Sequence, residues 1–147
     1  MSVREERTGW RDESISQRHR EWGFDCPAQD IDFLLIEYDK CVVKALFEYK
    51  NEHAGKQTRS KPQYKALIDL GNRASIPVFN VRYSDDLSEY IVTALNELAE
   101  EKLPDGIRKP PRVLMDELGY VTFLYKLRDR EIPEWLKMRI EERSNNE

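Results

Sequence analysis

Three ionisable residues, Asp32, Glu48 and Lys50, have the types and spacing of a metal-dependent hydrolytic site. Two carboxylates with room for water and a phosphate oxygen are typical ligands of magnesium. A lysine beside such a metal can orient or deprotonate an attacking water, or stabilise charge on a phosphate. The alternative is a surface strand with three ordinary solvated charges, which is the usual origin of a short Glu-x-Lys pattern.

Two apolar runs, 31–38 and 42–50, carry these residues and flank a short polar break centred on Lys40. Each run has the length of a strand and is rich in β-branched and aromatic residues. Two such runs joined by a short loop predict an antiparallel hairpin.

A loop centred in the polar break predicts that Tyr38 faces Val42 and that Asp32 faces Glu48. Directly paired residues lie on the same face of a sheet, with Cβ atoms roughly 5 Å apart. Lys50 lies two residues beyond Glu48 and therefore shares this face. Opposed carboxylates on a half-buried face repel one another and raise the pKa of one of them. We therefore expect a cation between them.

At these residues the chain resembles the PD-(D/E)XK, or restriction-endonuclease-like, nuclease superfamily. Asp32, followed sixteen residues later by Glu48-Tyr49-Lys50, looks like its D…(D/E)-x-K signature, and Pro27 is a loose counterpart of its proline. The strands also look like those of small nucleases common in phages and prophages. As a pattern the resemblance covers roughly residues 13 to 100, but only the three charged residues are specific.

The resemblance implies an α/β fold whose central mixed β-sheet contains the catalytic hairpin and is flanked by helices, with an α-β-β-β-α-β core. It implies hydrolysis of phosphodiester bonds, in DNA rather than RNA, with Mg²⁺ or Mn²⁺. Asp32, Glu48 and the main-chain carbonyl of Tyr49 would hold the metal, and Lys50 would position the attacking water. A first-helix acid, Glu13 or Glu21, could join them.

Candidate nucleic-acid contacts lie on both sides of the hairpin. The stretch from 53 to 68 contains no acidic residue, and its basic side chains could hold a phosphate backbone. The alternative is a mobile solvated loop. The resemblance adds Gln63, early in the helix expected at 62–73, and Arg18 and His19 of the first expected helix. The alternative is a solvated side chain for Gln63 and Arg18, and a side chain packed inward for His19. The candidates are Arg18, His19, Lys56, Arg59, Lys61 and Gln63.

Three segments are expected in the sequence: a flexible tail at 1–11, a nuclease-like core at 12–103 and a helical extension at 104–147. In the core we expect helices at 12–22, 62–73 and 89–102, a short edge strand at 23–27, and a strand at 76–84 parallel to its neighbour. The extension contains two expected helices, from about residue 115 and from Pro133, which pack on the core or at a homodimer contact.

The composition indicates a polar globular protein: 147 residues, 39% hydrophobic and 35% charged, with a net charge of −4. No apolar run approaches the ~20 residues needed to span a membrane, and the two cysteines lack metal-site spacing, so a reducing cytosol is expected. No phosphate-binding glycine loop, histidine-rich site or G-x-S-x-G motif occurs. Two alternatives to a nuclease remain: a non-catalytic nucleic-acid-binding or assembly protein on the same scaffold, and a structural protein that oligomerises through its tail helices.

Overall fold

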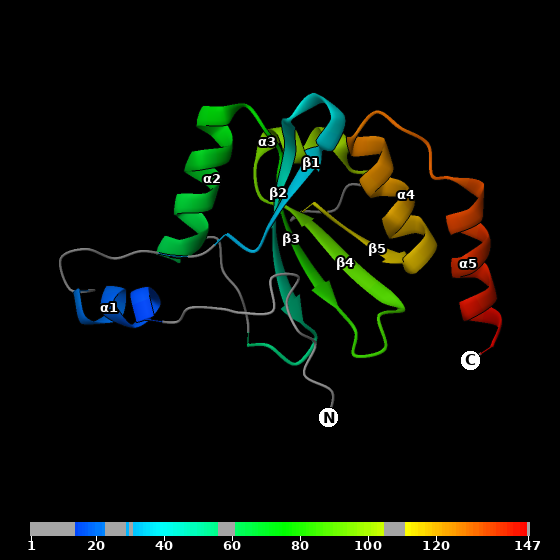
Figure 1. The fold of residues 1–147 in the computed structure, drawn as a ribbon, viewed down its shortest axis with the longest axis horizontal. Helices are drawn as coiled ribbons and strands as arrows, with labels where there is room; N and C mark the ends of the chain where they lie inside the picture. The colour runs from blue at the N-terminus through cyan, green and yellow to red at the C-terminus, as the bar shows by residue number, and fades with distance from the viewer. Residues whose placement is uncertain (1–13, 23–28, 30, 56–60, 105–110, 147) are drawn as a thin grey trace. The chain divides into compact units, whose positions relative to one another are not determined.

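The computed structural model describes residues 14–22, 29, 31–55, 61–104 and 111–146. The chain divides into two units, 1–30 and 31–147. The first unit contains helix α1 (Ser14–Trp22), and the second contains the sheet and the other helices (Figure 1). The position of one unit relative to the other is not defined. The tail expected at 1–11 and the short strand expected at 23–27 lie outside the described residues.

The second unit is an α/β structure built on one five-stranded mixed sheet, as expected for the coarse fold class. The strands lie in the order β1-β2-β3-β4-β5; β2 and β3 are parallel and all other neighbours are antiparallel. The elements are β1 (Phe33–Glu37), β2 (Val42–Asn51), α2 (Pro62–Ala74), β3 (Val78–Tyr83), β4 (Glu89–Ala94), α3 (Glu97–Lys102), β5 (Arg112–Asp116), α4 (Glu117–Leu127) and α5 (Glu134–Asn145).

The β1–β2 hairpin has the predicted strands but not the predicted loop. A 3₁₀ turn at Tyr38–Lys40 closes the hairpin one residue earlier on the first strand, so Val42 pairs with Glu37, and the predicted Tyr38–Val42 pair is wrong. A bulge between Leu35 and Ile36 then shifts the register by one residue. Beyond the bulge Phe33 pairs with Phe47, which is the register that the sequence predicted for the outer part of the hairpin.

The helix expected at 89–102 is wrong in its first half. Residues Glu89–Ala94 form β4 between β3 and β5, and only Glu97–Lys102 are helical, as α3. The apolar residues whose spacing predicted one helix belong to two elements, β4 and α3. Asn96 separates these elements because its side chain caps α3 by accepting a hydrogen bond from the Ala99 N–H.

The C-terminal segment supplies both expected helices, α4 and α5, and also completes the sheet with β5. Pro133 precedes α5 in extended backbone, as expected for a helix start. Tyr120, Phe123 and Leu127 of α4 are buried in the main hydrophobic cluster. Residues 111–127 are therefore part of the core of the second unit.

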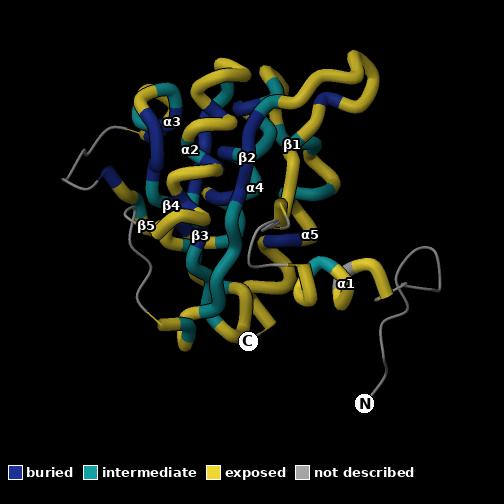
Figure 2. Tube along the Cα trace, turned by 90° about the vertical axis from the view of Figure 1, so that its left-hand side faces the viewer, coloured by how far each residue is buried: buried dark blue, intermediate teal, exposed yellow. Residues whose placement is uncertain are grey.

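The two faces of the sheet have different coverings, and α2 and α4 lie on opposite sides of it (Figure 1). Odd-numbered residues of β2 and β3, such as Phe47 and Phe79, pack with α4. Even-numbered residues Leu46 and Val78 pack with Tyr64 and Leu67 of α2. Buried backbone runs along the middle of β2, whereas β1 is mostly exposed (Figure 2).

Asn96 and Gly71 fit α2 tightly against β3. The Asn96 side chain is 6% exposed; its Oδ1 accepts from the Val78 N–H at 3.1 Å, and its Nδ2 donates to the Ile76 carbonyl at 2.9 Å and to Asn72 Oδ1 at 3.2 Å. A Cβ at Gly71 would lie 2.1 Å from Val78 Cγ2, so only glycine allows this approach.

The hairpin end of β1 is anchored by ion pairs to the segment after α4. Glu37 is 2% exposed, and its carboxylate accepts from Arg130 Nε at 2.8 Å and pairs with Arg128 at 3.4 Å. Burial raises the pKa of Glu37, but the two guanidinium groups outweigh burial and hold the pKa below its ordinary value.

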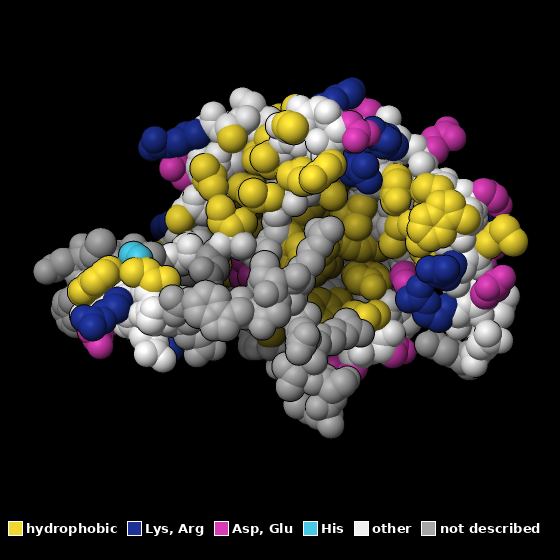
Figure 3. Space-filling view, in the orientation of Figure 1, with side chains coloured by type: hydrophobic (Ala, Val, Ile, Leu, Met, Phe, Trp, Pro, Cys, Tyr) yellow, Lys and Arg dark blue, Asp and Glu magenta, His cyan; other side chains and the backbone are white. Residues whose placement is uncertain are grey.

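Strand β1 is an edge strand of the sheet in the described residues, and it exposes several apolar side chains. Figure 3 shows hydrophobic side chains gathered over the central part of the molecule. They include Phe33, Leu34 and Ile36, with exposed fractions of 60%, 47% and 42%. No helix in the described part of the chain has both the length and the apolar content to cross a membrane.

Candidate functional site

The two predicted carboxylates lie together at the start of β1 and the middle of β2. Continuing the Phe33–Phe47 register by one residue brings Asp32 opposite Glu48. Asp32 Oδ2 also accepts a hydrogen bond from the backbone N–H of Tyr49 at 3.0 Å. This bond ties the residue before β1 to the middle of β2 and orients its carboxylate.

Glu48 is the less exposed member of the pair, and Lys50 is its countercharge. The Glu48 side chain is 16% exposed, and its Oε1 lies 3.3 Å from Lys50 Nζ. Burial raises the pKa of Glu48, and the charge of Asp32 raises it further, while the hydrogen bond and charge of Lys50 act against both. The pKa of Glu48 is raised overall, so Lys50 only partly offsets the effects of burial and of the Asp32 charge.

The backbone of β2 presents a carbonyl at the same edge. Even-numbered residues turn their backbone groups toward β3: the Leu46 N–H donates to the Pro77 carbonyl and the Glu52 N–H to the Tyr83 carbonyl. Odd-numbered residues face the β1 side, as the Tyr49 N–H does. The N–H and carbonyl of one strand residue point to the same edge, so the Tyr49 carbonyl shares the side of Asp32.

These oxygens fit a hard divalent cation such as Mg²⁺ or Mn²⁺. Two carboxylates and a main-chain carbonyl form an all-oxygen donor set, and one carboxylate is exposed enough to leave room for water. Burial and then the charge of Asp32 raise the pKa of Glu48, and a cation bound between the acids would offset both effects. Asp32, Glu48 and the Tyr49 carbonyl would hold such an ion.

Helix α2 contributes a tyrosine to the same face of the sheet. Tyr64 is 4% exposed, and its hydroxyl donates to Asn80 Oδ1 at 3.1 Å. Asn80 lies on β3 as the lateral partner of Glu48. Burial first, and then the charge of Glu48, raise the pKa of Tyr64 to about 12, which indicates that the phenol and the carboxylates are close in space.

Arg82, the next even-numbered residue of β3, is the lateral partner of Lys50. Its guanidinium donates to the carbonyls of Ala54 at 2.5 Å and Gly55 at 3.1 Å. These bonds hold the chain as it leaves β2. Arg82 therefore has a structural role at the entrance to the basic segment.

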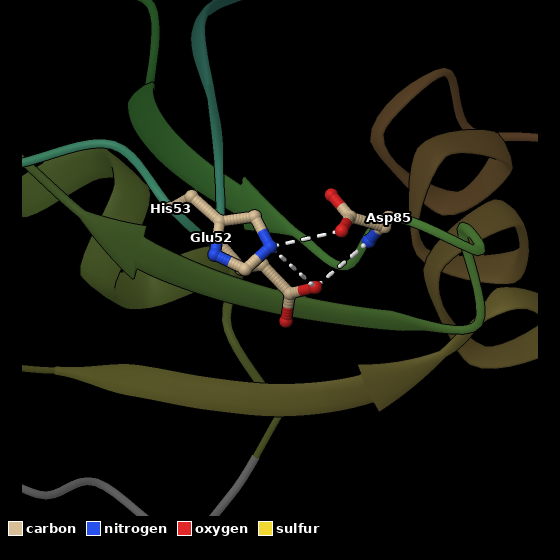
Figure 4. A group of neighbouring side chains, drawn as sticks. All are labelled: Glu52, His53 and Asp85. Atoms are coloured by element: carbon tan, nitrogen blue, oxygen red, sulfur yellow. Dashed lines mark hydrogen bonds and ion pairs between the residues drawn. The ribbon is translucent and has the colours of Figure 1, made fainter.

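A second polar group lies just beyond Lys50, where the parallel strands β2 and β3 end (Figure 4). His53 Nε2 lies 2.8 Å from Asp85 Oδ2 and 3.7 Å from Glu52 Oε1, and Glu52 Oε1 accepts from the Asp85 N–H at 3.1 Å. The hydrogen bond and the charge of Asp85 raise the pKa of His53. Hydrogen bonds from Asn51 and His53 lower the pKa of Asp85.

This second group has the ligand types of a cation site, and all three side chains are exposed. Its internal bonds connect the turn after β2 to the turn after β3. In the described residues it therefore acts as a bridge between the two strand ends.

The predicted nucleic-acid contacts have different outcomes. Lys61 and Gln63 are exposed at the start of α2, the end of this helix that carries Tyr64. Lys56 and Arg59 lie outside the described residues. Arg18 and His19 lie on α1, in the unit whose position relative to the sheet is not defined. Of the two first-helix acids, Glu21 is exposed on α1 and Glu13 lies outside the described residues.

The sequence interpretation did not identify Tyr64, Asn80 or the Glu52–His53–Asp85 group as site residues. In the sequence, the hydroxyl of Tyr64 is the available signal for a polar contact. Asn80 becomes a neighbour of Glu48 only through the register of two parallel strands that α2 separates in sequence. No local pattern gives that register.

Comparison of the chain with protein-family models, curated proteins and solved structures finds no match in any of the three.

Proposed function

We propose that this protein is a Mg²⁺- or Mn²⁺-dependent nuclease that hydrolyses phosphodiester bonds in DNA, as an endonuclease. The observation that carries the proposal is the convergence of Asp32, Glu48 and Lys50 at one place on the sheet. The Asp32 carboxylate is bound to the Tyr49 N–H at 3.0 Å, and Lys50 Nζ lies 3.3 Å from Glu48 Oε1.

The raised pKa of Glu48 adds an energetic argument. A structural residue at this position would avoid a half-buried carboxylate beside a second acid, because the arrangement costs stability. Perturbed carboxylates of this kind concentrate at functional sites, where the unfavourable charge is used by a ligand. A solvated surface strand would not explain the low exposure of Glu48, at 16%.

The proposed reaction is the attack of a water oxygen on phosphorus. The attacking water loses a proton to solvent as its oxygen bonds to phosphorus, the bond from phosphorus to the ester oxygen breaks, and the leaving oxygen takes a proton from solvent. A bound divalent cation would lower the pKa of the attacking water and offset charge on the phosphate. Asp32, Glu48 and the Tyr49 carbonyl would hold that cation. Lys50, held beside Glu48, would orient the water and donate a hydrogen bond to the phosphate oxygen.

The proposal includes an α-β-β-β-α-β core. In the described residues two strands, β1 and β2, precede α2; the segment 23–27, where the sequence predicts a further strand, lies outside them. It also includes a homodimer for cutting two strands, since symmetric dimers present two equivalent sites, and a reducing cytosolic setting. Contacts of Lys61 and Gln63 with the DNA backbone belong to the same proposal.

The experiment is a cleavage assay on plasmid and oligonucleotide DNA with Mg²⁺, with Mn²⁺ or with EDTA. We expect cleavage with either metal and none with EDTA. Lys50→Ala and Asp32→Asn should each reduce kcat at least about 100-fold, the usual minimum for loss of a group that acts on the attacking water. Lys44→Ala is the matched control, because Lys44 also lies on β2 but pairs with Asp129 at 3.4 Å.

Two outcomes would contradict the nuclease. Cleavage that survives in Lys50→Ala and Asp32→Asn would assign the activity to another site or to a contaminant. Metal-independent binding of DNA without cleavage would instead support the non-catalytic nucleic-acid-binding protein. Thermal unfolding of each variant shows whether a lost activity reflects a lost fold.

A further inference from the structure

The face of the sheet under α2 changes from apolar to polar along β2 and β3. The parallel register pairs Leu46 with Val78 and, two residues further, Glu48 with Asn80. The first pair is buried and packs with α2. The second pair is only partly buried and polar. The boundary between the apolar core and the candidate site therefore runs between these two pairs.

Tyr64 crosses this boundary. Its ring belongs to the same buried cluster as Leu46 and Val78. Its hydroxyl reaches the polar Glu48–Asn80 pair and donates to Asn80 Oδ1 at 3.1 Å. Phenylalanine would pack as well at this position without having to place a hydroxyl. Among the described residues, the bond from this hydroxyl sets the orientation of the Asn80 amide.

The orientation of this amide leaves its NH₂ group without a bond to another described residue. A carboxamide has its oxygen on one side and its NH₂ group on the other, so an Asn80 oxygen held by Tyr64 directs the NH₂ group away from the phenol. Among the hydrogen bonds between described residues, none is donated by Asn80 Nδ2. Asn80 Nδ2 is not among the buried side-chain atoms that lack a partner, so this donor is accessible to a ligand, on the strand beside Glu48.

Neighbouring groups on this face are already engaged. Arg82 donates to two backbone carbonyls, and Lys50 is paired with Glu48. The acceptor that suits a neutral NH₂ donor beside a cation-binding pair of carboxylates is an anionic oxygen of the substrate. A further carboxylate would add to the repulsion already present.

We propose that Asn80 donates a hydrogen bond to a non-bridging oxygen of the substrate phosphate, and that Tyr64 is a positioning residue that holds the Asn80 amide in the required orientation. Asn80 touches substrate, whereas Tyr64 acts only through Asn80. The role in catalysis rests on the proposed nuclease function; the contact with a phosphate oxygen can be tested by binding alone.

The test is a double-mutant cycle with Asn80→Ala and Tyr64→Phe in the full chain. One hydrogen bond to a charged oxygen corresponds to about a 10- to 100-fold loss in kcat/KM for Asn80→Ala. Tyr64→Phe should cost less, because the amide can still reach the productive orientation part of the time. The double variant should be no worse than Asn80→Ala alone, since Tyr64 has no effect once the amide is gone.

Two further measurements separate positioning from a general loss of structure or metal. The affinity for Mn²⁺ by calorimetry should stay within about twofold of wild type in both variants, well below the tenfold change that loss of a metal contact would give. Thr93→Val is the matched control, because Thr93 lies on the same face as the other lateral partner of Asn80. This variant should keep wild-type kcat/KM.

Binding of a fluorescent oligonucleotide, measured by anisotropy in Ca²⁺, keeps this inference distinct from the nuclease proposal. If the wild-type chain cleaves DNA but Asn80→Ala keeps its kcat/KM and affinity, the Asn80 contact is overturned and the nuclease stands. If losses in the two single variants add in the double variant, the positioning role of Tyr64 is overturned. If the wild-type chain is inert, the nuclease proposal fails, and equal affinities of wild type and Asn80→Ala overturn the phosphate contact as well.

Discussion

Replacing Asn96 with alanine removes the side chain that joins β3, α2 and α3. Its oxygen accepts from the N–H groups of Val78 and Ala99 at 3.1 and 2.9 Å. Its NH₂ group donates to the Ile76 carbonyl and to Asn72 Oδ1 at 2.9 and 3.2 Å. All four bonds are lost together in the variant.

The magnitude follows from what each lost bond leaves behind. Loss of the α3 cap costs about 1 kcal/mol. The buried N–H of Val78 is left without its side-chain acceptor, which costs about 1 to 3 kcal/mol. Asn72 is exposed, so water replaces its bond at little cost. We expect Asn96→Ala to lower the free energy of unfolding by about 3 kcal/mol and Tm by about 10 °C.

Urea unfolding followed by circular dichroism measures this loss, with Asn72→Ala as the control. The control removes only the exposed bond and should cost less than about 1 kcal/mol. A loss below about 1 kcal/mol for Asn96→Ala would refute the reasoning, because the buried bonds could not then be intact in solution. An equal loss in both variants would assign the effect to α2 rather than to the connection between α2, α3 and β3.

Three further predictions concern charge and close packing. The pKa of Glu48 is raised above its ordinary 4.5, so its ionised form costs stability. Glu48→Gln should therefore stabilise the fold at about pH 7 and lose this gain below about pH 4. Unfolding free energies of variant and wild type that are equal at both pH values would contradict this. The lowered pKa of Glu37 means that its ionised form stabilises the fold. Arg130→Met should therefore lower Tm at about pH 7, and by less as the pH falls to about 3. A difference in Tm that does not depend on pH would count against the ion pair. Gly71→Ala brings a Cβ to 2.1 Å from Val78 Cγ2 and should cost about 1 to 3 kcal/mol in urea unfolding; a neutral result would mean that α2 lies further from β3.

In the hairpin, a local pattern predicts the contact between Asp32 and Glu48 although the predicted position of the loop is wrong. The loop was predicted one residue too far along the first strand, and the Tyr38–Val42 pair was wrong. The bulge after Leu35 compensates for this error. Asp32 and Glu48 therefore come together as the sequence predicted, while the bulge that brings them together has no signal in the sequence pattern.

The interpretation of residues 89–102 failed for a different reason. Apolar residues at three- and four-residue intervals predicted one helix, but Glu89–Ala94 form a strand between two others. Hydrogen bonding to β3 and β5 on both sides decides the conformation of β4. Such non-local bonds outweigh a weak helical period.

The amino-acid sequence by itself determined the elements whose cause is local: the β1–β2 hairpin, the α2 start at Pro62, and the terminal helices after Asp116 and Pro133. It also determined which acids and which lysine share one face of the hairpin, because side chains alternate along a strand. Tertiary structure alone decided that Asn80 lies beside Glu48 and that Tyr64 reaches across to it. The physical reason is that the register of parallel strands, and the packing of a crossover helix on them, depend on contacts between residues far apart in the chain.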